Sequence, residues 1–568
     1  MSSEALFGIL SSMNKEEEIR DKASENAVER LIWRTSKKDQ ADITQKLADG
    51  AEIPEVYNLG EAGIFDEFFH FLYSFGIEPL LQMLNPGKNK RDSHIDFHSV
   101  ILIYIMRIVC GLRFFSHTKI LLQSQSLMQL AGFNGRKVRY GSTQRGVRKK
   151  EASDAEEAES GDRIRGPIDV GSIASWIERI SASRLERFFN SVISILAKNR
   201  FFPKKIHAVL DASEIESTEQ CIGRGKVKKE KAPELRLRKA RIKKTVVIVF
   251  GFKIWVVWEP KRKLPLAMRF APIQTHDIKM AQAVVEQAIK NVAPYAKITS
   301  LAIDRGFTDG KFLWWLDQNG VIFYIPAKEN MQVYADAISL VSSGIEQQRI
   351  KKYYVGRGKN RQEKEVLYRA VGINALTSAG WYGELGSGSH ENAKSFKPNP
   401  INAVVVLDSH YKKENDDDLL VILTNGAVDK PLATYDAYDR RSEIENSLFR
   451  EAKQAWFIER PARNSDKAFR AHAYLTITMM ALTHVFRIWI EEQDNKELAG
   501  ENTGIRKYRE QIRKENANKL IVFDGDQYAI FEVYELFILA GRNVLRPRGV
   551  EEVITKEDIL RKYGAILE

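Results

Sequence analysis

The stretch from residue 204 to about residue 330 constrains the fold most, because patterns typical of strands alternate there with amphipathic helical patterns. "KIHAVLDAS" predicts a short strand that ends at Asp211, and two β-rich stretches follow it. After a helical pattern, "KITSLAIDRGF" predicts another strand, which ends at Asp304, and a helix and a buried strand come next. This order predicts a mixed α/β sheet, and such sheets place their chemistry beyond strand ends.

The two aspartates are the first candidate site residues. Either one alone is more often a turn or helix-cap residue. Because Asp211 and Asp304 each close a predicted strand in one α/β unit, they can converge at one edge of the sheet. Clustered carboxylates suit Mg²⁺ or Mn²⁺, since hard cations prefer oxygen ligands. Two such ions roughly 4 Å apart can activate water and stabilise the leaving oxygen in phosphodiester cleavage, a site that usually needs a third carboxylate.

A candidate for the third carboxylate lies in "YDRRSEIENSLFREAK". On an α-helix, Arg441 comes three residues after Tyr438 and Glu445 four residues after Arg441, so the three side chains share one stripe. A tyrosine and an arginine beside a catalytic carboxylate suit contacts to DNA phosphates. The alternative is a surface helix whose arginines and glutamates form ion pairs worth only about a few tenths of a kcal/mol each.

Composition narrows the class of partner. The formal net charge of +12 favours a polyanion, nucleic acid before membrane. The two cysteines exclude a cysteine-rich zinc site and argue against a disulfide framework, which favours a reducing, intracellular setting. The two longest apolar stretches, residues 100–115 and 473–490, are interrupted by polar and charged residues, so they predict buried helices rather than membrane spans.

A basic segment, residues 223–244, lies between two of the predicted strands. It carries eleven lysines and arginines against two glutamates. The segment is either a solvated loop or a surface that follows a phosphate backbone, with affinity that falls steeply with salt. Its candidate DNA contacts include Lys228, Lys229, Arg236, Arg238, Lys239 and Arg241.

The segments "VLDAS", "LAIDRGF" and "YDRRSEIENSLFREAK", in this order, resemble the catalytic motifs of DDE insertion-sequence transposases of the IS-four-like group. The family's spacing of tyrosine, arginine and glutamate matches without adjustment. Its usual lysine, seven residues after the glutamate, falls on Ala452, and Lys453 stands one place later. Arg305, next to the second aspartate, also matches the family's segment.

The resemblance implies an RNase H-like catalytic domain in which Asp211, Asp304 and Glu445 bind two Mg²⁺ or Mn²⁺ ions. It implies cleavage at the element's ends and strand transfer into target DNA, with Tyr438, Arg441, Lys453 and Arg305 on DNA. The implied partners are double-stranded DNA, as terminal inverted repeats and target, and a second copy of the chain, in the cytoplasm at the nucleoid. An RNase H-like nuclease or resolvase and an inactive, domesticated DNA-binding protein remain open as alternatives.

The expected fold is therefore α/β, with an RNase H-like mixed sheet, a β-rich insertion and a mostly helical N-terminal domain. The long spacing between Asp304 and Glu445 contains four strand patterns and predicts the insertion. The N-terminal region suits either a helix-turn-helix module for DNA ends or a helical bundle with a basic loop. The predicted borders are 1–204 for the helical region, 205–330 for the first catalytic part, 331–430 for the insertion, 431–490 for the helices with the glutamate, and 491–568 for a small interaction or dimerisation region.

Overall fold

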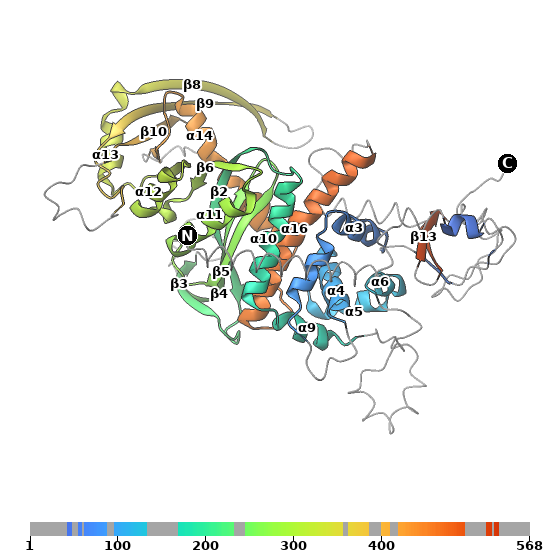
Figure 1. Cartoon of the computed structure of the whole chain (residues 1–568). Helices are drawn as coiled ribbons and strands as arrows, with labels where there is room; N and C mark the ends of the chain where they lie inside the picture. The colour runs from blue at the N-terminus through green and yellow to red at the C-terminus, as the bar shows by residue number, and fades with distance from the viewer. Residues whose placement is uncertain are drawn as a thin grey trace, which may run out of the picture. The chain divides into compact units, whose positions relative to one another are not determined.

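A computed structural model gives the fold (Figure 1). It describes residues 42–47, 51, 55–58, 62–87, 96–132, 168–231, 245–355, 362–384, 399–408, 419–494, 519–524 and 527–532. The chain divides into two compact units, one of residues 1–192 and 454–568 and the other of residues 193–453. Each unit is described by itself, and the domain borders expected from the sequence remain predictions.

The unit of residues 193–453 is built on one 10-stranded sheet, in the order β3-β4-β2-β6-β7-β11-β10-β9-β8, with β5 also paired to β4. The strands are β2 (Lys205–Ser217), β3 (Gly225–Lys231), β4 (Thr245–Glu259), β5 (Leu264–Pro272), β6 (Lys297–Ile303), β7 (Ile322–Pro326), β8 (Ile345–Val355), β9 (Gln362–Leu376), β10 (Ile401–Asp408) and β11 (Leu420–Thr424).

The centre of this sheet has the ribonuclease H arrangement. On one side, β2 pairs antiparallel with β4, and β4 pairs antiparallel with β5. On the other side, β2 pairs parallel with β6, and β6 pairs parallel with β7. Helix α11 (Ile278–Val292) connects β5 to β6, and helix α12 (Gly310–Gln318) connects β6 to β7. Parallel strands are usually covered on both faces, and β6 has the matching apolar run, with Leu301 to Ile303 buried. The fold class predicted from the sequence is confirmed, and the elements follow the predicted order apart from β3, which was not predicted.

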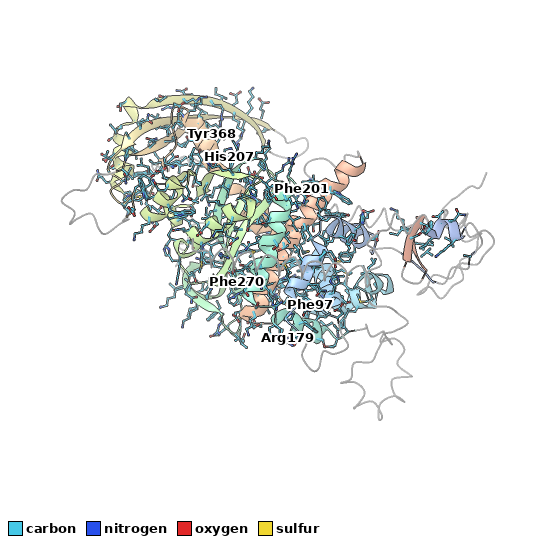
Figure 2. All side chains as sticks on the ribbon, viewed as in Figure 1. Phe97, Arg179, Phe201, His207, Phe270 and Tyr368 are labelled. Atoms are coloured by element: carbon cyan, nitrogen blue, oxygen red, sulfur yellow. The ribbon has the colours of Figure 1, made fainter. Side chains whose placement is uncertain are left out.

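The strands predicted between Asp304 and Glu445 are present as β8 to β11, and they extend the same sheet. β11 pairs antiparallel with β7 through Ile422 and Leu423, and β10, β9 and β8 follow in turn. Helix α14 (Pro431–Asp439) packs on this part of the sheet, as Figure 1 shows. Its Leu432 and Tyr435 join a core cluster that includes Tyr368 of β9, which is labelled in Figure 2.

The other unit is mainly helical where it is described. Its helices are α3 (Ala62–Ser74), α4 (Phe97–Val109), α5 (Thr118–Gln123), α6 (Gln125–Leu130), α9 (Val170–Glu178) and α16 (Asp466–Asp494), while α10 (Ala182–Lys198) crosses the border in the chain. The strands β1 (Glu55–Asn58), β12 (Lys519–Asp524) and β13 (Gln527–Glu532) form a small sheet. Every residue of α4 is buried, as predicted for this apolar stretch. Within the described ranges, no helix has the length and apolar character that crossing a membrane requires.

A polar cluster is buried in this helical unit. Tyr104 of α4 hydrogen-bonds through its hydroxyl to Nδ1 of His472 in α16, at 3.0 Å, and Nε2 of His472 lies 3.1 Å from the carbonyl oxygen of Phe457. Arg107 donates to the carbonyl oxygen of Arg460 at 2.7 Å. Burial, followed by the nearby Arg107 charge, lowers the pKa of His472 from 6.5 to about 3. The imidazole is therefore neutral and structural at neutral pH.

Candidate active site

The two predicted aspartates lie on neighbouring strands of the ribonuclease H sheet. Leu210 of β2 pairs with Ile303 of β6 in parallel register, so the next residues, Asp211 and Asp304, lie side by side at one level of the sheet. Asp304 directly follows the last residue of β6, as expected. Asp211 does not end its strand, because β2 continues to Ser217 through antiparallel pairing with β4. The sequence interpretation was wrong on this point, since the polar residues after Asp211 remain compatible with an antiparallel ladder.

The segment with the third carboxylate is broken into three helical pieces. α14 ends at Asp439, the π-helix η7 (Ile444–Phe449) carries Glu445, and α15 (Arg450–Gln454) follows. The turn between α14 and η7 is held by backbone bonds of i to i+3 type, including Arg441 N–H to the Tyr438 carbonyl at 2.9 Å. The expectation of one continuous α-helix is therefore wrong. A π-helical turn takes up about one residue more than an α-turn, which moves every later side chain round the axis.

Arg441 connects the carboxylates. Its Nη1 lies 3.4 Å from Oδ2 of Asp211 and 3.0 Å from Oε1 of Glu445. The same guanidinium hydrogen-bonds with the Tyr438 side chain and interacts electrostatically with Asp304. The structure thus brings together the five residues that the three sequence motifs single out, although they come from segments up to 234 positions apart (445 − 211).

Burial and charge both act on Asp211. The pKa of its carboxyl is raised from 3.8 to about 7, chiefly by desolvation; the Ala212 N–H and the Arg441 charge oppose this rise, and Glu445 and Asp304 add to it. The Ala212 N–H donates to Oδ1 of Asp211 at 2.8 Å. Burial lowers the pKa of Arg441, but the acidic groups around it outweigh that effect and raise it above its ordinary value. The carboxylates of the site thus disfavour one another's ionisation, and the guanidinium of Arg441 offsets part of this effect.

Tyr438 is anchored by its ring. The ring packs against the core cluster that includes Val404, Ile422 and Tyr435. Burial raises the pKa of the Tyr438 hydroxyl, and the charge of Arg441 opposes that rise. The phenol is therefore neutral, and its position next to Arg441 is set by packing of α14 on β9, β10 and β11.

The donor set suits a hard divalent cation, because Asp211, Asp304 and Glu445 offer only carboxylate oxygens. Among the residues that the structure describes, no three His, Cys, Asp or Glu side chains stand together so as to hold a metal ion in their present positions. The positive group found among these carboxylates is the guanidinium of Arg441.

The remaining predicted contacts of the motif segments lie on the same unit. Arg305 is exposed in the short helix η4 (Arg305–Phe307), directly after Asp304. Lys453 is partly exposed in α15, whereas Ala452, which stands where the family has its lysine, is fully buried. A lysine at position 452 would have to bury its charge, so Lys453 is the residue of this turn that can present an ammonium group.

The basic segment is in part a strand. Residues 225–231 form the edge strand β3, which pairs with β4, so the expectation of a loop is wrong for this part. Lysine on an edge strand is common because its charge discourages further strand pairing. Lys228 is exposed, and Lys229 forms an ion pair with Glu214 of β2. Arg236, Arg238, Lys239 and Arg241 lie outside the described residues.

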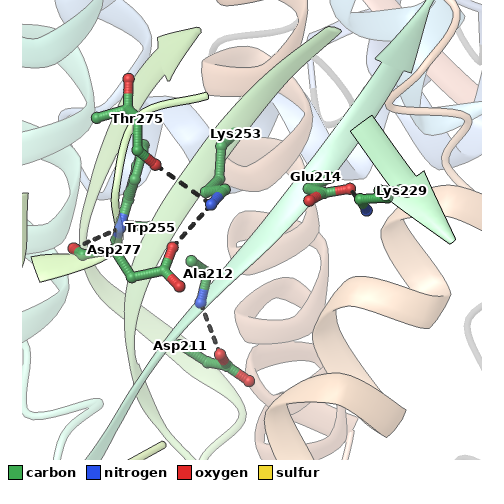
Figure 3. A network of polar contacts seen from close by, with 8 residues as sticks. All are labelled: Asp211, Ala212, Glu214, Lys229, Lys253, Trp255, Thr275 and Asp277. Atoms are coloured by element: carbon green, nitrogen blue, oxygen red, sulfur yellow. Dashed lines mark hydrogen bonds and ion pairs between the residues drawn. The ribbon is translucent and has the colours of Figure 1, made fainter. Parts of the chain in front are cut away.

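A second polar group, which sequence reasoning missed, joins β4 (Thr245–Glu259) to the segment before α11 (Figure 3). Lys253 of β4 donates to Oδ1 of Asp277 at 2.9 Å, and Nε1 of Trp255 donates to the Asp277 carbonyl at 3.0 Å. Oδ2 of Asp277 lies 3.2 Å from where a Cβ on Gly306 would be. The segment "THD" before α11 was a visible signal, but the lysine partner comes from a strand 24 residues away.

The ribonuclease H-like sheet carries two of the three candidate carboxylates, Asp211 within β2 and Asp304 directly after β6. Residues 202–483 match the family described as transposase DDE domain, so this part of the chain is a DDE domain of the transposase family. The match covers 282 of the 568 residues (483 − 202 + 1), and membership of the IS-four-like group remains a prediction.

Comparison with whole proteins adds little. No curated protein matches the sequence of this chain. Among solved structures, a piggyBac transposase synaptic complex with hairpin DNA is similar at a TM-score of 0.35 and 8% identity, over 85% of this chain and 81% of that chain. A likeness this weak does not place any residue of the site.

Proposed function

We propose that this protein is a cut-and-paste transposase that cleaves DNA at element ends and joins the freed 3′-hydroxyl to target DNA. The single observation that supports it best is the pairing of Leu210 with Ile303, which sets Asp211 beside Asp304, with Glu445 joined to Asp211 through Arg441. The DDE family match supports the reaction class.

In this proposal Asp211, Asp304 and Glu445 hold two Mg²⁺ or Mn²⁺ ions. When bound, such ions activate a water or hydroxyl nucleophile and neutralise the leaving oxygen in an in-line phosphoryl transfer. Asp211 is fixed by the Ala212 N–H and by its place inside β2, so its oxygens keep one position. Glu445 is the more exposed carboxylate and completes the set from the helical side.

The cationic side chains of the site position DNA. Arg441 offers a planar group of donors that matches phosphate oxygens, and the neutral Tyr438 hydroxyl beside it can donate a further hydrogen bond. Arg305 and Lys453 would contact the backbone on either side, and the lysines of β3 would extend this contact away from the site. We propose terminal inverted repeats and target DNA as the two DNA partners, a homodimer as the assembly that joins two ends, and the cytoplasm, at the nucleoid, as the location.

The experiment incubates purified protein with Mg²⁺ and DNA that carries the sequences flanking its own gene, together with a supercoiled target plasmid. We expect strand nicks at a fixed position, joined products with the plasmid, and loss of both in Asp304→Asn. Asp429→Asn, an exposed acid of the same unit, is the matched control and should behave as wild type. Cleavage without joining would indicate a nuclease or resolvase, and binding without cleavage in both Mg²⁺ and Mn²⁺ would indicate a DNA-binding relic.

A further inference from the structure

One guanidinium nitrogen serves two of the three carboxylates. Nη1 of Arg441 contacts Asp211 at 3.4 Å and Glu445 at 3.0 Å. The Asp211 side chain is 11% exposed and that of Arg441 is 20% exposed, whereas the Glu445 side chain is 57% exposed. The arginine is therefore embedded on the side of Asp211, and Glu445 reaches it from the solvent side.

The position of this charge has a direct consequence for metal binding. A carboxylate oxygen that accepts from a guanidinium presents that lone pair to a fixed positive charge, and a divalent cation at the same oxygens would be repelled by it. Arginine stays charged at any pH a protein tolerates, so loss of a proton cannot remove its repulsion of the metal ion. Metal and Arg441 must therefore compete for Asp211 and Glu445.

We propose that Arg441 is an internal counterion of the carboxylates, which divalent ions displace when they bind. This inference rests on the proposed function, because it takes Asp211 and Glu445 as metal ligands. Without the arginine, three neighbouring carboxylates would repel one another with no cation between them. With the arginine in place, its positive charge offsets the repulsion between the carboxylates while no metal is bound.

The displaced guanidinium can bind a DNA phosphate instead. Arg441 lies in the turn between α14 and η7, and its neighbour Tyr438 is fixed by packing, so the head group can swing while the backbone keeps its position. A DNA phosphate offers the same bidentate acceptor geometry as a carboxylate. Binding of DNA and binding of metal should then favour each other, because DNA draws Arg441 away from the metal ligands and metal releases Arg441 to contact DNA, and such coupling is reciprocal.

The test measures Mn²⁺ binding to the full chain by electron paramagnetic resonance, without DNA. Arg441→Gln should bind Mn²⁺ at least about tenfold more tightly than wild type, because the variant lacks the charge-assisted contacts with Asp211 and Glu445. Arg440→Gln is the matched control, since Arg440 is the exposed neighbour in the same turn, and it should leave the affinity unchanged. Equal or weaker binding in Arg441→Gln would overturn the inference.

A second measurement covers the case in which Arg441→Gln does not fold. Adding a short DNA duplex to the wild type should raise its Mn²⁺ affinity by a similar factor, and no change on adding DNA would overturn the inference. The two proposals fail in different ways. If Asp211→Asn binds Mn²⁺ as well as wild type does, the proposed metal site is wrong, and both the proposed function and the counterion role of Arg441 are contradicted. If Asp211→Asn loses binding while Arg441→Gln matches wild type, only the counterion role falls.

Discussion

Leu210 of β2 and Ile303 of β6 pair with each other in adjacent parallel strands. Asp211 follows Leu210 directly, and Asp304 follows Ile303 directly. This register brings together two carboxylates 93 positions apart (304 − 211), Asp211 within β2 and Asp304 directly after β6. A shift of one residue in either strand would turn one aspartate to the opposite face, because side chains alternate along a strand. The relative position of these two aspartates therefore depends on the pairing of the two strands.

Lys453 should act on DNA despite its unusual spacing. Lys453 comes eight residues after Glu445, and in a regular α-helix this spacing would place the two side chains about 80° apart around the axis. The π-helix η7 contains about one residue more per turn, so Lys453 lies closer to the face of the helix that carries Glu445. We expect Lys453→Ala to weaken DNA binding severalfold and to lower the slope of log affinity against log salt by about 1. Lys453→Arg should retain most of the affinity. Binding isotherms over a salt series measure this, and an unchanged slope in Lys453→Ala would rule the contact out.

The edge strand β3 permits a comparison of two adjacent lysines. Lys228 is exposed, whereas Lys229 is paired with Glu214, so their ammonium groups are not equally available to a phosphate. Lys228→Ala should reduce DNA affinity and lower the salt slope by about 0.9, the value for one phosphate contact. Lys229→Ala should change the slope less. Equal effects of the two variants would argue against a contact specific to Lys228.

The helical unit should be sensitive to acid through His472. The pKa of this imidazole is lowered from 6.5 to about 3 in the folded chain. At a pH between these two values, His472 is therefore protonated in the unfolded chain but neutral in the folded chain. Stability from this group is therefore complete above pH 6.5 and is lost as pH falls toward 3, by up to about 1.4 kcal/mol per pH unit.

Chemical denaturation at pH 7 and pH 5 measures this loss. His472→Gln removes the titrating group, so its stability should fall less between the two pH values than that of wild type, even though its stability at pH 7 is lower. Parallel losses in the two proteins would show that His472 is not responsible.

Much of the fold could be predicted from the sequence, because the ribonuclease H elements are marked by strong local patterns. Apolar runs such as that of β6 and the amphipathic α11 each specify one element with little competition. The continuation of β2 past Asp211 could not be predicted, since "SEIES" alternates weakly and is held by pairing with β4. Strand pairing across a long sequence distance is not visible in a local pattern.

The sequence singled out residues that the structure brings together, but it did not predict their local geometry. The motif spacing identified Tyr438, Arg441 and Glu445, but a uniform helix was assumed between Glu445 and Lys453. The displaced lysine was itself a signal, because one extra residue before it is what a π-helical turn accommodates. The counterion contact of Arg441 with Asp211 could not be seen in the sequence, because it depends on how α14 and η7 are placed against β2.

The most direct test of the central claim compares Glu445→Gln with Glu443→Gln in Mg²⁺-dependent nicking of end DNA, with DNA binding measured in parallel. Glu443 lies two residues before Glu445. Burial and, to a smaller extent, Asp439 raise the pKa of its carboxyl, while Arg440 and Lys263 oppose that rise, so the candidate metal ligands are not among the causes. We predict that Glu445→Gln loses at least about 100-fold in cleavage while it still binds DNA, because removing a ligand should cost no less than removing its support. Glu443→Gln should cleave like wild type. Full cleavage by Glu445→Gln would contradict the assignment of the third carboxylate and, with it, the account of this site.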